Sequence, residues 1–368
     1  MTMRTKPPFR ADHVGSLLRP KELADARVKW HEGKLSAEAL KELEDNAVRD
    51  VVALQEGVGL KAITDGEFRR DTWHLDFIYG FEGIVPDEET HGINLIKGEK
   101  LMTQKVVGRI GNNSGYMREH FAFLKSATKE TAKFCIPAPA LVFIRGGRAA
   151  IDKTAYPDLD EFWTDLIAAY ANEVKALGDL GCTYLQFDDT SLAFLCDPDY
   201  RAKMKARGDD PDKLVERYAS ATSQAIANRP REMTVTCHMC RGNYKSTWMT
   251  QGGYEPVAEI MFANLDVDGY FMEFDDERSG GFEPLRFVPD DKLVVVGVIT
   301  SKTAALEPKD VIKRRIDEAA KYVPLDRLCL SPQCGFSSTH HGNALTEDEE
   351  RRKLAHVVEI AEEIWGSA

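Results

Sequence analysis

The sequence lacks several features that would place it in a large class of proteins. Its 368 residues contain no apolar run long enough to cross a membrane, and no apolar run follows the charged N-terminus MTMRTKPPFR. Neither a membrane span nor a signal peptide is therefore predicted. Basic residues are in the minority, with 48 Lys and Arg against 60 Asp and Glu. The net charge of −12 argues against a nucleic-acid groove and against binding to an anionic membrane surface.

Cysteine is also too sparse for a disulfide framework, because the seven cysteines are odd in number and irregularly spaced. Thiols that stay free indicate a reducing cytoplasm, where they are available for metal binding or catalysis. A Gly-rich dinucleotide fingerprint and a phosphate loop are both missing. Their absence argues against an open α/β sheet that binds nucleotides.

What the chain does have is a regular alternation of short apolar, β-branched runs with amphipathic helical stretches. Hydrophobic residues make up 43% and charged residues 29%, which is ordinary for a soluble domain with a sizeable core. Eight rounds favour a closed (β/α)₈ TIM barrel, so we expect one α/β domain over residues 1–368. The predicted strands, some with the loop that follows, cover residues 9–18, 60–73, 131–143, 183–191, 233–240, 267–276, 292–301 and 328–338, and the predicted helices cover 20–32, 36–58, 119–130, 158–180, 210–229, 254–264 and 346–364.

Residues 80–118 interrupt this rhythm. The stretch INLIKGEKLMTQKVVGRIG is typical of a β-hairpin that turns at Lys97 and Gly98. We therefore expect an excursion from the barrel after the second strand. Because it follows the loop that carries Glu67, it should lie near the mouth of the barrel.

A candidate metal site begins with the stretch CHMC at the end of the fifth predicted strand. Alternate residues of a strand share a face, so His238 and Cys240 point the same way. In barrels of this kind the active site lies at the C-terminal ends of the strands, where Glu273 and Cys334 also fall. Nitrogen, sulfur and carboxylate donors are the ligands that zinc prefers. Polar residues at the other strand ends are His13, Ser16, Asp65, Glu67, Asp188, Asp189, Thr300 and Ser301.

Each of these ligands also has a purely structural explanation. A His-x-Cys pattern arises by chance, Cys334 could be a buried thiol, and Glu273 competes with the acidic residues at 275–277, which fit a solvated turn. Free cysteine is commonly buried. On that basis we expect Cys135, Cys182, Cys237 and Cys329 to pack in the core, and we assign no role to Cys196. His340 and His341 are expected in a loop. The roles of His13 and His74 remain open.

The motifs HVGS, TDGEFRR, QFDDTS, CHMC, FMEFD and SPQCG follow one another within residues 9–365. In this order they resemble the catalytic barrel of cobalamin-independent methionine synthase, and above all its short single-barrel bacterial relatives. The resemblance implies the same zinc ligands, which are His238, Cys240, Glu273 and Cys334.

The resemblance also implies a site for the amino and carboxylate groups of homocysteine. Its residues would be Ser16, Glu67 and Asp188, with Glu67 and Asp188 also in the catalytic role. The implied reaction is methyl transfer to homocysteine to give methionine, with Zn²⁺ as cofactor and with methyltetrahydrofolate or another donor, such as methylcobalamin. Zinc would hold the substrate sulfur as a thiolate, because a free thiol is a poor nucleophile at neutral pH.

The chain departs from this family in two respects. It has no room for the second, N-terminal barrel of the full-length enzymes. Where the family has an acid histidine after the seventh strand, this chain has Thr300, Ser301 and Lys302. That histidine is proposed to protonate the departing folate, so its replacement leaves open a corrinoid or another alkyl donor.

Two competing hypotheses follow. A zinc alkyltransferase could join a coenzyme M-like thiol to an epoxide, and Arg19, Arg69 or Arg70 would then bind the sulfonate. A non-catalytic zinc- or thiol-binding barrel is disfavoured, because polar residues occur at several strand ends besides those of the metal site. The expected partners are a small thiol, with homocysteine preferred, and a folate or corrinoid methyl donor, with neither nucleic acid nor membrane. The sequence leaves a homo-oligomer open.

Overall fold

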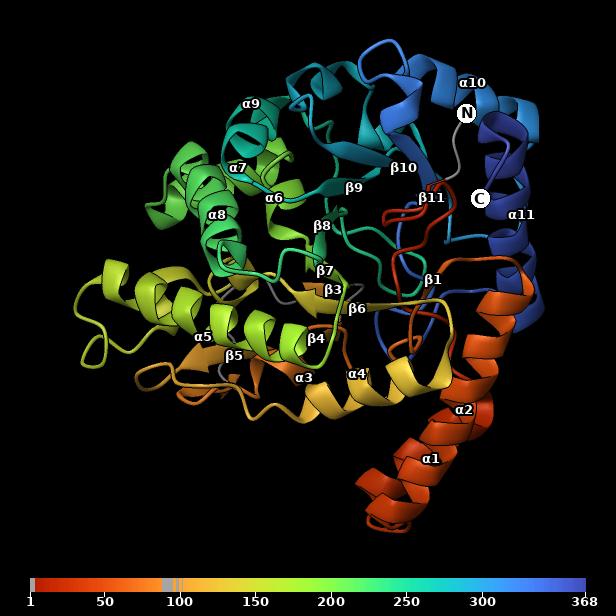
Figure 1. Ribbon diagram of the computed structural model, residues 1–368. Helices are drawn as coiled ribbons and strands as arrows, with labels where there is room; N and C mark the ends of the chain where they lie inside the picture. The colour runs from red at the N-terminus through yellow and green to blue at the C-terminus, as the bar shows by residue number, and fades with distance from the viewer. Residues whose placement is uncertain (1–3, 88–94, 97–98, 101) are drawn as a thin grey trace.

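A curled, parallel sheet of seven strands forms the centre of the protein, with helices on its outside (Figure 1). The computed structural model describes residues 4–87, 95–96, 99–100 and 102–368. The strand order β1-β6-β7-β8-β9-β10-β11 follows the chain, as expected for successive β/α units. The fold is therefore α/β and consistent with a TIM-like barrel. The strands are β1 (Ala62–Ile63), β6 (Thr131–Pro137), β7 (Tyr184–Asp189), β8 (Thr234–Met239), β9 (Gly269–Glu273), β10 (Leu293–Ile299) and β11 (Leu328–Pro332).

Five of the described helices, α2, α5, α7, α8 and α11, begin at a side-chain cap. Asp158 caps α5 by accepting from the backbone N–H of Asp160, and the predicted capping box of Thr346 and Glu349 at the start of α11 is confirmed. The α-helices are α1 (Lys21–His31), α2 (Ala37–Gly57), α3 (Leu75–Ile78), α4 (Tyr116–Ala127), α5 (Leu159–Asp179), α6 (Ser191–Phe194), α7 (Pro198–Arg207), α8 (Pro211–Ile226), α9 (Glu255–Asn264), α10 (Lys309–Ala319) and α11 (Glu347–Trp365). The 3₁₀ helices are η1 (Pro139–Val142), η2 (Gly147–Ala150), η3 (Glu277–Ser279), η4 (Glu283–Phe287) and η5 (Leu325–Arg327).

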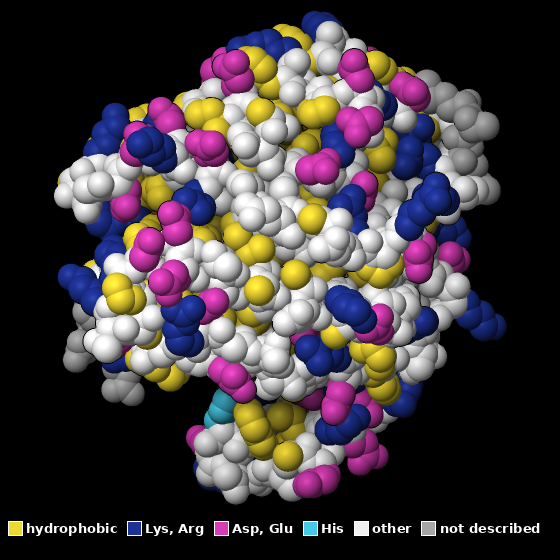
Figure 2. All heavy atoms as spheres, turned by 60° about the vertical axis from the view of Figure 1, so that its left-hand side comes forward, with side chains coloured by type: hydrophobic (Ala, Val, Ile, Leu, Met, Phe, Trp, Pro, Cys, Tyr) yellow, Lys and Arg dark blue, Asp and Glu magenta, His cyan; other side chains and the backbone are white. Residues whose placement is uncertain are grey.

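The outer surface carries charges of both signs. On the face in Figure 2, Lys and Arg side chains are interspersed with Asp and Glu. Helices α1 and α2 project from the body as an antiparallel pair (Figure 1). None of the described helices is both long and apolar enough to cross a membrane.

The prediction of a first strand over residues 9–18 is wrong. This segment makes one isolated parallel bridge, between Ala11 and Leu330 of β11. Its backbone cannot continue as a regular strand, because Gly15 has a φ of 136° and the Asp12 carboxylate binds the N–H groups of its own segment. The segment nevertheless bonds to β11 through Asp12 N–H and to the loop after β1 through Leu17 N–H, which donates to Gly66 O. The sheet thus has seven regular strands among the described residues, and residues 9–18 lie between its two ends.

A fully buried ion pair holds this segment in place. Lys133 of β6 lies with its Nζ 2.9 Å from Asp12 Oδ1, and both side chains have 0% exposure. Tyr184 of β7 donates its hydroxyl to the second oxygen of Asp12 at 2.8 Å. The ammonium also lies 4.0 Å from the centre of the Phe271 ring. One charge pair therefore connects the N-terminal segment to three strands of the sheet.

The predicted excursion corresponds to two small antiparallel pairs between β1 and α4. Strand β2 (Ile84–Asp87) pairs with β5 (Thr103–Val106), and β3 (Leu95–Ile96) pairs with β4 (Glu99–Lys100). The predicted turn at Lys97 and Gly98 lies outside the described residues. The complete hairpin therefore stays a prediction.

Replacing Lys133 by Met should lower the free energy of unfolding by about 3–5 kcal/mol, because it leaves the Asp12 carboxylate charged and buried without its partner. Urea unfolding followed by circular dichroism measures this loss. The double variant Asp12→Asn/Lys133→Met should recover part of it, because no buried charge remains. Lys175→Met, which removes an exposed pair with Asp179, should cost less than about 1 kcal/mol. An equally small loss for Lys133→Met would contradict the role of the buried pair.

A second buried acid makes stability depend on pH. Glu350 of α11 is 1% exposed and accepts a hydrogen bond from Leu18 N–H at 2.9 Å. Burial raises the pKa of this carboxyl group to about 8, with the Leu18 hydrogen bond opposing the shift. The folded protein then retains a proton that the unfolded chain loses above a pKa of about 4.3. Stability is lost as the pH rises from about 4 to 8.

Glu350→Gln should therefore be about 1–3 kcal/mol more stable than the parent protein at pH 8 and about equally stable at pH 4, below the pKa of the unfolded carboxyl group. The amide keeps an acceptor for Leu18 N–H and cannot ionise. Denaturant unfolding at both pH values tests this expectation. The exposed replacement Glu362→Gln serves as the control and should change stability at neither pH. Identical pH profiles for Glu350→Gln and the parent would disprove the assignment.

Candidate active site

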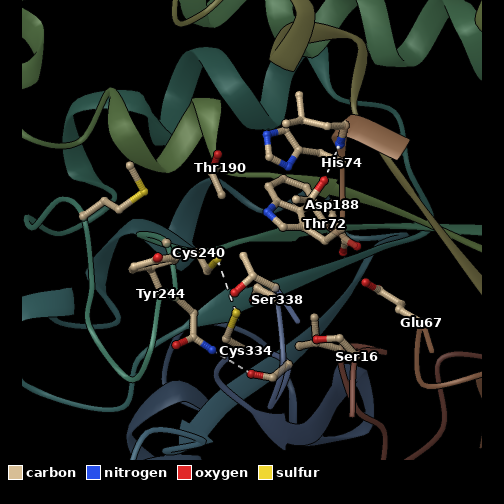
Figure 3. A pocket seen from close by; sticks show the side chains of 18 of the residues that line it. Ser16, Glu67, Thr72, His74, Asp188, Thr190, Cys240, Tyr244, Cys334 and Ser338 are labelled. Carbon is tan, nitrogen blue, oxygen red and sulfur yellow. Dashed lines mark hydrogen bonds between the residues drawn. The ribbon is translucent and has the colours of Figure 1, made fainter. Parts of the chain in front are cut away.

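His238, Cys240 and Cys334 meet at the mouth of the curled sheet. His238 lies in β8, Cys240 follows that strand, and Cys334 follows β11. Strands β8 and β11 are separated by two others, yet one ligand atom from each of the three residues lies within 4.8 Å of the other two. The sulfurs of Cys240 and Cys334 are 3.6 Å apart (Figure 3). Only the curl of the sheet brings these two strand ends together.

The three side chains fit a zinc ion by their chemistry and their spacing. All are at most 5% exposed, and neither ring nitrogen of His238 has a hydrogen-bond partner among the described residues. Two sulfurs bound tetrahedrally to one zinc at about 2.3 Å would lie roughly 3.8 Å apart, close to the spacing here. The shared hydrogen bond with Cys240 lowers the pKa of Cys334 well below its ordinary value, although burial opposes the shift. The site therefore has a buried nitrogen, a thiolate and a thiol that could hold a metal.

Glu273, the predicted fourth ligand, ends β9 and is surrounded by cations. One carboxylate oxygen accepts from the Arg241 backbone N–H at 2.7 Å. The other accepts from Arg278 Nη2 at 2.8 Å and from Lys302 Nζ at 3.3 Å. Burial alone would raise the pKa of Glu273, but the charges of Lys302, Arg278 and the Arg241 guanidinium, which lies 3.6 Å from Oε2, outweigh it and lower the pKa to about 2. Glu273 does not belong to the three-residue cluster among the described residues, and its role as a ligand stays a prediction.

Glu67 and Asp188 form a second group in the same cavity. Their carboxylates lie with the Cys135 sulfur in a cluster whose atoms are within 4.8 Å of one another. Glu67 has a φ of 61°, unusual for a residue with a side chain, and this backbone directs its carboxylate inward from the loop after β1. Asp188 Oδ1 accepts from Gln186 Nε2 at 2.7 Å. Sequence reasoning assigned Cys135 to packing and missed its place beside the two acids.

Too little positive charge lies near the two carboxyl groups to keep both of them ionised in their buried position. The Glu67 carboxylate forms an ion pair with Arg70 at an N–O distance of 3.8 Å, and Glu67 Oε2 is buried without a hydrogen-bond partner among the described residues. Burial raises the pKa of Glu67 to about 8, with Asp188 adding to the shift and Arg70 opposing it. Burial likewise raises the pKa of Asp188 to about 6, although His238 opposes it. Such a pair would gain most from a cation, such as an ammonium group, that binds between the carboxylates.

Both groups line one cavity of about 280 Å³ (Figure 3). Ser16, the remaining predicted substrate residue, also faces it. Gly335 leaves room for this serine, because a Cβ at that position would lie 2.0 Å from Ser16 Oγ. The other residues that line the cavity are Val14, Thr72, Trp73, His74, Leu75, Met102, Arg145, Asp189, Thr190, Gly242, Asn243, Tyr244, Met249, Ser338, Thr339, His340 and His341.

The three arginines considered for sulfonate binding do not line the cavity. The Arg19 guanidinium donates to four backbone carbonyls, including those of Glu67 and Ser337. Arg69 pairs with acidic residues of α2. Arg70 donates to Cys135 O at 2.7 Å. These cations position loops around the site.

Sequence reasoning did not establish that three further residues, Arg145, His74 and Lys302, lie at or near the cavity. Arg145 follows η1 and had no motif to mark it, whereas the TWH triplet of the charged loop contained His74 without deciding its role. Lys302 was noted only as standing where a histidine was expected. His13 does not line the cavity, and its ring bonds to Ala62 O.

Replacing Cys334 by Ser should abolish stable zinc binding, because it removes one of the two sulfurs and the thiolate of the cluster. Metal analysis of the purified protein should give about one zinc per chain for the parent and almost none for the variant. Cys237→Ala is the control, since Cys237 lies in β8 next to His238, packs in the core and belongs to neither ligand cluster among the described residues. Full zinc content in Cys334→Ser would remove Cys334 from the metal site.

Comparison with known proteins gives one consistent result. Residues 9–363 match the family described as the catalytic domain of cobalamin-independent synthase. The uncharacterized protein YxjH of Bacillus subtilis is 45% identical over 363 residues, which cover 98% of this chain and 96% of that protein. A 5-methyltetrahydropteroyltriglutamate–homocysteine methyltransferase of Bacillus velezensis is 22% identical, and the alignment covers 88% of this chain but only 39% of that longer relative.

Solved structures agree with this match. A protein from Listeria monocytogenes, assigned provisionally as a vitamin-B12-independent methionine synthase, is 39% identical with a TM-score of 0.80, and the alignment covers 99% of this chain and all of that one. A B12-independent methionine synthase from Shewanella, in complex with selenomethionine, shares the fold at 21% identity with a TM-score of 0.73. That alignment covers 96% of this chain and 97% of the Shewanella chain.

Proposed function

Because the chain belongs to the catalytic-domain family of the cobalamin-independent methionine synthases, we propose that it transfers a methyl group to the sulfur of homocysteine. The observation that carries this proposal is the meeting of two complementary groups in one cavity. His238, Cys240 and Cys334 offer soft donors for a metal, and Glu67 and Asp188 offer negative charge for an amino group. Methyltransferases of this family act on an amino-acid thiol, which has both features. We also propose that residues 9–18 take the eighth position of a closed barrel.

The metal proposed for this site is zinc, held by His238, Cys240 and Cys334, with Glu273 as the candidate fourth ligand. When bound, zinc supplies a positive charge that keeps the substrate sulfur as a thiolate at neutral pH. The thiol proton is released to solvent. The sulfur lone pair then forms the new bond to the methyl carbon, and the electron pair of the broken bond stays on the donor.

The protein residues orient the thiol for this attack. Glu67 and Asp188 would bind the ammonium group of the substrate between them. The positive charge of this ammonium group would lower the raised pKa values of both carboxyl groups and so favour their ionisation. Ser16, which also lines the cavity, would donate its hydroxyl to the substrate carboxylate. Holding the amino acid at two points leaves the sulfur directed toward the two cysteines, which is the orientation that the reaction requires.

Lys302 occupies the region where the family has an acid histidine, but its ammonium is already bound. Its Nζ lies 3.3 Å from both Glu273 Oε1 and Asp275 Oδ2. Burial lowers the pKa of Lys302, but these two acids outweigh burial and raise the pKa above its ordinary value. A lysine held in this way is a poor proton donor for a departing folate. The proposal therefore includes methylcobalamin as well as methyltetrahydrofolate among the donors.

A second candidate is the alkylation of a sulfonate-bearing thiol by an epoxide. Arg145 favours it, because this arginine lines the cavity. Glu67 and Asp188 oppose it, because two carboxylates would repel a sulfonate placed next to them. Homocysteine therefore remains the better match.

An activity panel tests the proposal. The zinc-loaded protein is assayed with homocysteine or coenzyme M as acceptor and with methyltetrahydrofolate, methylcobalamin or an epoxide as donor. We expect methionine as the product from homocysteine, and Glu67→Gln should raise the KM for homocysteine about tenfold or more because an ammonium loses a charged partner. The zinc content should not change.

The control uses 4-mercaptobutanoate, which is homocysteine without its amino group. Its KM should be high in the parent protein and should not increase further in Glu67→Gln. A variant that loses affinity for both thiols alike would show that Glu67 does not bind the ammonium group. Product from coenzyme M and not from homocysteine would establish the second candidate instead.

A further inference from the structure

One wall of the cavity carries polar groups that the proposed thiol site does not use. His74 lines the cavity, is 6% exposed and has no hydrogen-bond partner for either ring nitrogen among the described residues. Its ring lies against Trp73, with 4.6 Å between the ring centres. Buried polar atoms in proteins nearly always have a partner. Two unpaired nitrogens on one ring that borders a cavity indicate a partner that enters from the cavity.

Arg145 lines the same cavity from the adjacent strand unit. His74 lies in the loop after β1, and Arg145 lies in the loop after β6, which is the sheet neighbour of β1. The Arg145 guanidinium donates to Met102 O at 3.5 Å, and no described carboxylate lies within 4.0 Å of it. Arg69, by contrast, binds two carboxylates. Among the described residues, Arg145 is therefore a cation that borders the cavity without a carboxylate partner.

The two residues also influence each other. Burial lowers the pKa of His74 well below its ordinary value, and the charge of Arg145 lowers it further. The imidazole is therefore neutral, with one nitrogen able to donate and the other able to accept. Burial likewise lowers the pKa of Arg145. A positive group and a neutral hydrogen-bond donor that border one cavity are complementary to an acidic group.

We infer that His74 and Arg145 form a subsite for an anionic group on the second substrate, the one that donates the alkyl group. This inference rests on the proposed function for the assignment of the other substrate to Glu67 and Asp188. Arg145 supplies the charge, and His74 supplies an N–H to the same acid. In Figure 3 His74 lies beside Thr72 and on a different side of the pocket from Cys334.

The surrounding side chains favour an organic anion over a free inorganic ion. Trp73, Met102 and Met249 line the cavity together with Arg145. An aromatic ring and two thioethers provide apolar contact for a carbon skeleton, and a charged group alone would not use them. The expected ligand is therefore a flat or apolar group that carries a carboxylate, a sulfonate or a phosphate ester. A neutral alkyl donor would leave Arg145 without a partner.

Binding of small aromatic probes to the full-length, zinc-loaded protein tests the subsite without turnover. Benzoate, benzenesulfonate and phenyl phosphate represent the three acids, and benzamide is the neutral match for benzoate. Dissociation constants come from calorimetry or ligand-observed NMR. We expect at least one of the anions to bind the parent protein about tenfold more tightly than benzamide does, and the order among the anions identifies the acid.

Variants then assign the preference to the two residues. Arg145→Met should abolish the preference for the anion, and Arg145→Lys should retain most of it. His74→Phe keeps a ring against Trp73 and removes both nitrogens, so it should weaken binding of the anion by severalfold. His74→Asn, which can still donate a hydrogen bond, should restore part of this loss in affinity. Homocysteine binding should stay within about twofold of the parent in all four variants, because no step of the thiol site uses these residues.

Two results would overturn the inference. One is equal affinity of the parent protein for the anions and for benzamide. The other is a large loss of homocysteine binding in Arg145→Met, which would assign Arg145 to the thiol. Failure of the proposed function appears separately, as the absence of methionine in the activity panel, and it leaves the anion preference measurable.

Discussion

The buried ion pair between Lys133 and Asp12 is the interaction on which the rest of the structure depends. It fastens the irregular N-terminal segment between the two ends of a curled seven-stranded sheet. That position allows β8 and β11 to face each other across the mouth, so that His238 and Cys334 come close together. The same segment carries Ser16 to the cavity. A charge pair without solvent is costly to break, and this protein uses it where no regular strand pairing is available.

Charge is distributed around the cavity according to what each group has to bind. Three of the predicted metal ligands are an imidazole and two thiols, and the fourth, Glu273, is kept ionised by three nearby cations. In the same cavity, burial raises the pKa values of Glu67 and Asp188, and the nearby cations do not offset it. Arg145 is the opposite case, a cation without an acidic neighbour among the described residues. Compensated groups maintain the structure, and uncompensated groups mark where ligands are expected to bind.

Loops rather than regular strands position most of the site. Glu67 depends on a left-handed backbone conformation, Cys334 lies past the end of β11, and Arg145 and His74 lie in loops. The arginines Arg19 and Arg70 stabilise these loops through backbone carbonyls, and this explains why they do not line the cavity. A rigid sheet with well-braced loops can hold two substrates in fixed orientations, as methyl transfer between them requires.

The sequence by itself determined the order of the seven regular strands, most of the helices between them, the α/β class and the grouping of polar residues at strand ends. Hydrophobic periodicity carries this information, and alternate residues of a strand share a face, so His238 and Cys240 could be paired from their spacing. The sequence could not show that residues 9–18 form no regular strand. There the Asp12 side chain competes with strand pairing, because it accepts hydrogen bonds from backbone N–H groups of its own segment. Only the tertiary structure decided that Cys135 lies beside Glu67. It also decided that Arg19 binds backbone carbonyls and Arg69 binds acids of α2, whereas Arg145 has no carboxylate partner among the described residues. Those outcomes depend on which side chains meet across the curled sheet, and distance along the chain does not encode such meetings.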